Sequence, residues 1–157
     1  MSIDTTLRIN STSLAATENL AAEVGTRTRG GEVIALSSDL GGGKTAFVRG
    51  LARGMGSENH VASPTFTLGR VYETKNKKLT LFHFDFYRLN DPGIMAFELA
   101  EVLTDPGAVV AIEWGAVMDD ILPTDTVAVT IERTGEESRD ISFTYPERLA
   151  YLFEDVS

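Results

Sequence analysis

The chain has 157 residues, of which 43% are hydrophobic, and it contains no cysteine. This length favours one folded domain over residues 1–157, and the absence of cysteine excludes a disulfide framework, a thiolate zinc site and a cysteine nucleophile. The formal charge of −9, from 23 acidic and 14 basic residues, disfavours direct binding of DNA or RNA over a broad face, because an acidic surface repels the phosphate backbone.

The sequence also argues against a membrane protein. No apolar stretch approaches the ~18 residues that a membrane-spanning helix needs. The N-terminal residues lack the basic segment followed by an apolar one that is typical of a secretory signal. We therefore expect a soluble, cytoplasmic protein without a membrane partner, and the lack of cysteine suits a reducing compartment.

The first third of the chain shows a helix, a strand and a second helix. An amphipathic helix is predicted over 12–25 from small or apolar residues at helical spacing, namely Leu14, Thr17, Ala21 and Val24. The apolar run 32–36 is typical of a buried parallel strand. After a loop over 38–43, a second helix is expected over 44–53, before two closely spaced glycines.

The remaining elements continue this alternation of strands and helices. We expect extended chain over 60–72, a strand over 79–87, a helix over 93–103 and a buried strand over 109–112. A hairpin follows, with strands over 127–132 and 139–144. This order predicts an α/β fold of three layers, with a mostly parallel sheet and an antiparallel hairpin at its C-terminal end.

The segment between the first strand and the second helix carries the strongest motif. Residues 38–45 read SDLGGGKT, which matches the phosphate-loop (P-loop) pattern G-x-x-x-x-G-K-[ST] except that Ser38 replaces the first glycine. In such a loop the backbone N–H groups of Gly41, Gly42 and Gly43 would wrap a phosphate at a helix N-terminus. Lys44 would reach the terminal phosphates and the Thr45 hydroxyl would bind Mg²⁺.

The replacement at Ser38 has a cost only in one conformation. A serine with a positive φ carries about 1–2 kcal/mol of backbone strain, and a serine in extended chain carries none. The alternative to a phosphate site is a glycine-rich turn in which Lys44 is a surface charge.

Two acidic residues end predicted strands. Glu113 closes the run 109–112 and should emerge at the carboxyl edge of the sheet, where α/β proteins bind ligands and where an acid can hold Mg²⁺. Asp85 shares a strand face with His83. The alternatives are a solvent-facing Glu113 and an Asp85 that pairs with Arg88. We expect no catalytic role for His83, and with two histidines in the chain a histidine metal site is not expected.

Five segments together resemble the TsaE family of small bacterial ATPases. The resemblance as a whole covers about residues 12–145. The five segments occur in the family's order and are Asp39–Thr45, Phe47–Leu51, Ser63–Leu68, His83–Leu89 and Ile112–Trp114. The resemblance implies a phosphate-loop NTPase-like fold that binds Mg-ATP and hydrolyses it slowly, weakly when alone. It also implies two partner proteins, TsaB and TsaD, which hold tRNA and form threonylcarbamoyladenosine in it, so that the acidic chain need not bind tRNA itself.

The resemblance also implies roles for residues at matching positions. Lys44, Asp85 and Glu113 would be catalytic, with Thr45 and Glu113 as the Mg²⁺ ligands. The nucleotide would contact the phosphate cradle and three residues outside it: Gly41, Gly42, Gly43, Lys44, Thr45, Ala46, Thr17, Asp85 and Arg139. Ala46 stands where a second hydroxyl residue is common in the family.

Three other functions remain open from the residues alone. A small-molecule kinase shares the phosphate loop but usually needs an arginine-bearing lid, and the arginines here are scattered. A GTPase usually selects guanine through N-K-x-D, and the Asn76-Lys77-Lys78 segment is followed by leucine. A nucleotide-gated assembly module would use ATP binding to order the loop 63–65 and alter a partner-facing surface.

Overall fold

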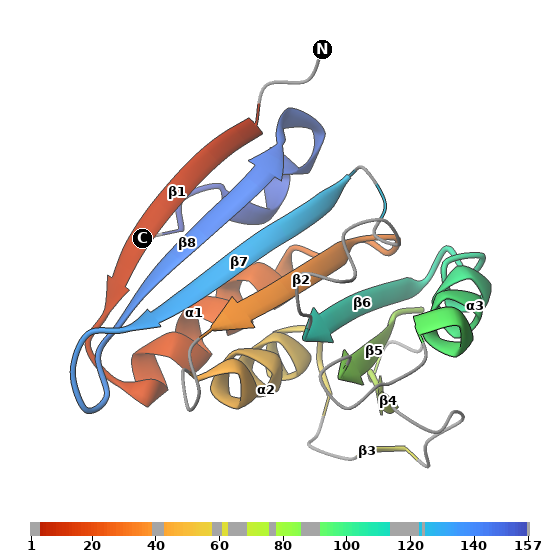
Figure 1. Ribbon diagram of the computed structural model, residues 1–157, viewed down its shortest axis with the longest axis horizontal. Coiled ribbons are helices and arrows are strands. Elements are labelled where there is room, and N and C mark those ends of the chain that lie inside the picture. The colour runs from red at the N-terminus through yellow and green to blue at the C-terminus, as the bar shows by residue number, and fades with distance from the viewer. Residues whose placement is uncertain are drawn as a thin grey trace.

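The computed structural model describes residues 4–38, 43–57, 61–62, 69–75, 78–85, 92–113, 123 and 125–156. Within these residues eight strands form one sheet, in the order β1-β8-β7-β2-β6-β5-β4-β3 (Figure 1). The strands are β1 (Asp4–Ser11), β2 (Val33–Ser38), β3 (Val61–Ala62), β4 (Gly69–Glu73), β5 (Thr80–Asp85), β6 (Ala108–Glu113), β7 (Thr126–Arg133) and β8 (Arg139–Pro146). The helices are α1 (Leu14–Thr26), α2 (Lys44–Gly54), α3 (Pro92–Val102) and the 3₁₀ helix η3 (Glu147–Phe153).

The middle of the sheet is parallel and both sides are antiparallel. Strands β5, β6, β2 and β7 pair in parallel, and β8 pairs antiparallel with β7. This confirms the α/β class, the parallel core and the C-terminal hairpin. Antiparallel pairing extends further than predicted, because β1 pairs with β8 and β3 and β4 continue beyond β5.

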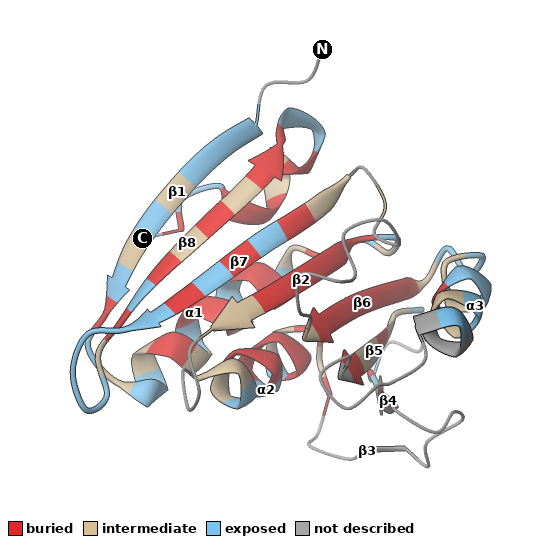
Figure 2. Ribbon diagram, viewed as in Figure 1, coloured by how far each residue is buried: buried red, intermediate tan, exposed pale blue. Residues whose placement is uncertain are grey.

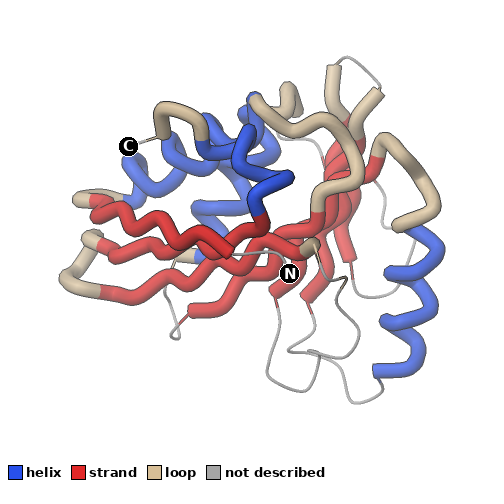
Figure 3. The backbone as a smooth tube through the Cα atoms, turned by 90° about the horizontal axis from the view of Figure 1, so that it is seen from above, coloured by secondary structure: helices blue, strands red, loops and turns tan. Residues whose placement is uncertain are grey.

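Helices cover both faces of the sheet (Figure 3). On one face, side chains of α1, α2 and η3 pack with strand residues such as Ile34, Leu36 and Ala111 in one core cluster. On the other face lie α3 and buried residues such as Ile112 and Phe84. Figure 2 shows β2 and β6 buried along most of their length. Two covered faces explain why the central strands are unbroken apolar runs.

Glycines bring α1 and α2 into close contact. A Cβ added to Gly50 would stand 2.0 Å from the carbonyl oxygen of Glu18, and one added to Gly54 would stand 2.0 Å from that of Ala22. Neither position can hold a side chain without separating the helices. The two glycines therefore fix α2, and with it the start of that helix, relative to α1.

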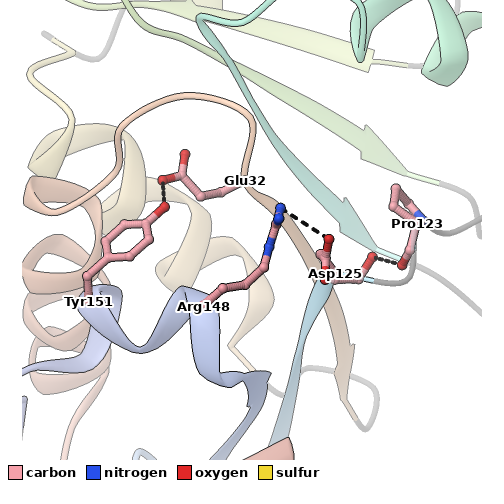
Figure 4. A network of polar contacts seen from close by, with 6 residues as sticks. Glu32, Pro123, Asp125, Arg148 and Tyr151 are labelled. Carbon is pink, nitrogen blue, oxygen red and sulfur yellow. Dashed lines mark hydrogen bonds and ion pairs between the residues drawn. The ribbon is translucent and has the colours of Figure 1, made fainter. Parts of the chain in front are cut away.

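The C-terminal helix η3 is fastened to the loop that precedes β2 (Figure 4). The carboxylate of Glu32, 2% exposed, accepts hydrogen bonds from the backbone N–H groups of Arg29 and Gly30, both at 2.8 Å. The hydroxyl of Tyr151 donates a third bond to it. The Arg29 guanidinium carbon lies 3.9 Å from the centre of the Tyr151 ring. These contacts satisfy a buried charge at the end of β2 opposite to Ser38.

In the described part of the chain, no helix has the length and apolar character needed to cross a membrane.

Candidate functional site

The predicted phosphate loop joins the carboxyl end of β2 to the start of α2. Ser38 is the last residue of β2 and pairs with Ile131 of β7. Its φ is not positive, so serine costs no left-handed strain at this position. Residues 39–42, which include the predicted cradle residues Gly41 and Gly42, lie outside the described residues.

The described end of the loop requires a glycine. Gly43 has φ 105° and ψ 14° and is the N-cap of α2, a left-handed conformation that glycine adopts readily. The helix begins with the bond from Phe47 N–H to the Gly43 carbonyl at 3.0 Å. Lys44 and Ala46 are half-buried and Thr45 is exposed. These three residues form the first turn of α2, and the backbone N–H groups at a helix N-terminus produce positive potential.

The two predicted acids lie on adjacent strands. Asp85 of β5 and Glu113 of β6 are register partners, and Glu113 is also the register partner of Leu36 in β2. Glu113 therefore ends the strand next to the one that leads into the phosphate loop. The backbone of Asp85 reaches the same edge of the sheet, and its side chain lies outside the described residues.

His83 contacts Glu113, which the sequence did not predict. The Nε2 of His83 lies 3.0 Å from Oε2 of Glu113, and the two side chains are 15% and 13% exposed. Because an ionised carboxylate only accepts hydrogen bonds, we assign Nε2 of His83 as the donor in this contact. The sequence signal was the position of His83 two residues before Asp85, on the same strand face.

The family resemblance had singled out Arg139, which lies beside Gly43, and Thr17, which contacts the register partner of Arg139. A Cβ on Gly43 would stand 3.6 Å from Nε of Arg139 and 4.0 Å from Cδ2 of Leu14, next to the start of α1. Arg139 is the register partner of Ser11. The hydroxyl of Ser11 lies 2.7 Å from that of the fully buried Thr17. Segments that are far apart in the sequence, at the start of α1 and the start of β8, therefore lie next to Gly43.

Local hydrogen bonds hold Arg139 in place. The residue is 3% exposed, and its Nη1 donates to the carbonyl oxygens of Ser138 at 2.8 Å and of Gly135 and Glu136 at 3.3 Å each. The β7–β8 turn therefore orients a buried guanidinium group beside the loop. A fixed cation at this place is suited to an anionic ligand.

The candidate metal ligands suit Mg²⁺ better than they suit a metal ion that is coordinated by protein side chains alone. Among the described residues, no three His, Cys, Asp or Glu side chains gather as a metal site. Mg²⁺ usually takes only one or two carboxylates and completes its shell with water and substrate phosphates. The hydroxyl of the exposed residue Thr45 and the carboxylate of Glu113 are oxygen donors of that kind.

Known proteins of the same kind match most of the chain. The family model described as threonylcarbamoyl adenosine biosynthesis protein TsaE matches residues 11–141. The tRNA threonylcarbamoyladenosine biosynthesis protein TsaE of Bacillus subtilis is 37% identical, over 81% of this chain and 78% of its own. Its counterpart in Treponema pallidum is 35% identical, over 87% of this chain and 98% of its own.

A solved structure agrees with the sequence comparison. The crystal structure of YdiB from Bacillus subtilis matches with a TM-score of 0.77 and 28% identity, over 99% of this chain and 97% of that one. A family match over most of the chain, relatives above 30% identity and a shared fold lead to one conclusion: the chain belongs to the TsaE family.

Proposed function

We propose that the protein is an Mg²⁺-dependent ATPase that hydrolyses ATP slowly and supports TsaB and TsaD in forming threonylcarbamoyladenosine in tRNA. The observation that carries the proposal is the phosphate-loop motif between β2 and α2, with Glu113 at the end of the adjacent strand β6. The names of the relatives, which are tRNA threonylcarbamoyladenosine biosynthesis proteins, supply the pathway.

The phosphates of ATP would bind at the start of α2. The backbone N–H groups of Gly41 to Ala46 would cradle them, helped by the positive potential of the helix N-terminus. Lys44 would neutralise the terminal phosphates, where negative charge increases as the leaving group departs. The buried Arg139 beside Gly43, together with Thr17, supports a further contact with the nucleotide.

Thr45 and Glu113 would hold the cation that accompanies ATP. The cation supplies charge neutralisation and orientation of the phosphate oxygens when it is bound. Glu113 suits this role because its side chain is 13% exposed, and a carboxylate with little access to water attracts a cation more strongly than one in bulk solvent.

Asp85 would orient the attacking water. Its register pairing with Glu113 supports this role, because a carboxylate at the same sheet edge is within reach of a ligand bound there. Asp85→Asn should then bind nucleotide and lose turnover. An Asp85→Asn protein that hydrolyses ATP at the wild-type rate with the partners present would contradict the assignment.

The partners would complete the site and bind the tRNA. The net charge of −9 is consistent with a subunit that reaches tRNA through other proteins rather than by a broad basic face. Such an arrangement predicts weak hydrolysis in isolation and faster hydrolysis in the complex.

The test is ATP turnover with Mg²⁺, first for the protein alone and then with TsaB, TsaD and tRNA. We expect weak activity alone, a clear rise with the partners, and loss of activity in both conditions for Lys44→Ala. Turnover that the partners leave unchanged would contradict the assembly role. Transfer of phosphate to a small acceptor without partners would identify a kinase, and preferential binding of GTP would identify a GTPase.

A further inference from the structure

The contact between His83 and Glu113 joins two strands at the edge where we propose that ATP binds. His83 of β5 is the register partner of Ala111, two residues before Glu113 on β6. Side chains two residues apart on a strand point to the same face. His83 and Glu113 therefore lie on the same face of the sheet, and Nε2 of His83 reaches Oε2 of Glu113 at 3.0 Å.

This hydrogen bond restricts the rotation of the Glu113 carboxylate. A glutamate side chain has several rotatable bonds, and immobilising it costs conformational entropy. The His83–Glu113 bond is largely shielded from water, with side chains 15% and 13% exposed, so the restriction exists before any ligand arrives. A cation that binds to Glu113 then finds the carboxylate already oriented.

We propose that His83 is a positioning residue: its Nε2–H holds one oxygen of Glu113 and so orients that carboxylate toward the divalent cation that accompanies ATP. The proposal rests on the proposed function. Groups that hydrogen-bond to metal ligands typically contribute 10–100-fold to metal affinity or activity. His83 acts through Glu113 and would touch neither the nucleotide nor the reacting atoms.

The first test measures cation binding rather than turnover. Mn²⁺ binding to the protein–ADP complex is followed by electron paramagnetic resonance, and ADP affinity is measured separately in EDTA. We expect His83→Leu to weaken Mn²⁺ binding by roughly 10–100-fold and to leave ADP affinity in EDTA unchanged. His83→Gln should keep most of the Mn²⁺ affinity, because its amide N–H can replace Nε2–H as the donor.

A matched control comes from the same strand. Thr80 begins β5, at the end away from Glu113, and Thr80→Val removes a polar group while keeping the side-chain shape. We expect this variant to bind Mn²⁺ and ADP as the wild type does. If His83→Leu behaves like Thr80→Val, or if ADP affinity in EDTA falls as much as Mn²⁺ affinity does, His83 does not position Glu113 for a cation.

A second test uses the wild-type protein and does not depend on the folding of a variant. The chain has two histidines, so ¹⁵N resonances of the imidazole rings can be assigned by comparison with His60→Gln. We expect His83 to be the Nε2–H tautomer, and its Nε2 resonance to shift in Glu113→Gln. An Nδ1–H tautomer would overturn the proposal.

The two proposals fail in different ways. If the wild type binds neither ADP nor Mn²⁺ with ADP, the proposed ATPase function falls, and the role of His83 falls with it. If the wild type binds both and His83→Leu binds both equally well, only the role of His83 is overturned.

Discussion

Arg139 lies against Gly43, with its Nε 3.6 Å from the position that a Cβ on Gly43 would occupy. One residue begins the last strand and the other ends the phosphate loop. Because the guanidinium group is buried and held by three backbone carbonyls, the hairpin β7–β8 presents a fixed cation to the loop.

Gly43→Ala should be strained by its backbone rather than by crowding. An alanine with φ 105° costs about 1–2 kcal/mol, whereas 3.6 Å from Arg139 is ordinary contact. The matched control is Gly31→Ala, with φ 91° and no atom within 4 Å of the added Cβ. Both variants should lose similar stability in urea unfolding, and only Gly43→Ala should also lose ADP affinity. Equal ADP affinity in the two variants would contradict a phosphate loop at Gly43.

Arg139→Gln should reduce both stability and nucleotide affinity. The change removes charge-assisted hydrogen bonds, which are typically worth about 1.5–3 kcal/mol. Arg133 provides the control, because it is the exposed register partner of Arg139 and donates from Nε to the Gly135 carbonyl at 3.0 Å. We expect Arg133→Gln to change urea stability little and to leave ADP affinity unchanged. Normal ADP affinity in Arg139→Gln would remove Arg139 from the nucleotide site.

Glu113→Ala should affect the cation more than the nucleotide. Loss of one carboxylate ligand should raise the Mg²⁺ concentration needed for half-maximal turnover by about 10-fold or more. Residues that only hydrogen-bond to a metal ligand already contribute about 10-fold or more to metal affinity, and a direct ligand should contribute at least as much. ADP affinity in EDTA should stay near the wild-type value. A normal Mg²⁺ requirement would exclude Glu113 as a ligand.

Tyr151→Phe should weaken the C-terminal attachment. It removes one donor to the buried carboxylate of Glu32, which costs about 1–3 kcal/mol. Tyr145→Phe is the control. Tyr145 stacks on Phe153 with ring centres 4.2 Å apart, and the variant also loses a tyrosine hydroxyl, but one that does not bind Glu32. Urea unfolding at neutral pH should show the loss only in Tyr151→Phe.

The raised pKa of Tyr151 should make the free energy of unfolding depend on pH in the alkaline range. Burial, and then the hydrogen bond and charge of Glu32, raise the pKa of Tyr151 above its ordinary value. The unfolded chain therefore releases this proton first, near pH ~10. The stabilisation is complete below that pH and is lost as pH rises above it. The stability difference between wild type and Tyr151→Phe should shrink above pH ~10, and a constant difference would show that Tyr151 titrates equally in both states.

Gly50→Ala should separate α1 from α2. In an isolated helix this change favours folding by roughly 0.5–1 kcal/mol, but here the added Cβ would stand 2.0 Å from the Glu18 carbonyl oxygen. Overpacking of this kind typically costs about 1–3 kcal/mol, and sometimes more. Arg49→Ala, at the adjacent exposed position, should be close to neutral. Thermal unfolding of the two variants tests the close contact, and a Gly50→Ala protein as stable as wild type would refute it.

The sequence alone determined the features that depend on residues adjacent to one another in the chain. Unbroken apolar runs identified β2 and β6, because strands covered on both faces need apolar side chains throughout. The pattern GGGKT between a strand and a helix predicted the phosphate loop, because phosphate binding there depends on consecutive backbone groups. The end of the run 109–112 also predicted that Glu113 would reach the carboxyl edge of the sheet, and the parallel pairing of β5 with β6 brings the backbone of Asp85 to that edge.

The strand β1 was missed because its local signal is weak. It has two apolar residues, Leu7 and Ile9, and most of its residues are exposed or half-buried. Its pairing with β8, at the other end of the chain, stabilises it as a strand. The helix η3 was missed for a similar reason: it is held by Tyr151 on Glu32 and by burial of Leu149 and Leu152, not by a periodic pattern of its own.

Only the tertiary structure decided which polar groups meet. The contact of His83 with Glu113 and the approach of Arg139 to Gly43 bring together residues from different strands and loops. Both depend on strand order and register. A single sequence records the residue types but not the register that pairs them. The sequence therefore indicated the chemistry of the site, and the fold determined the partners that orient it.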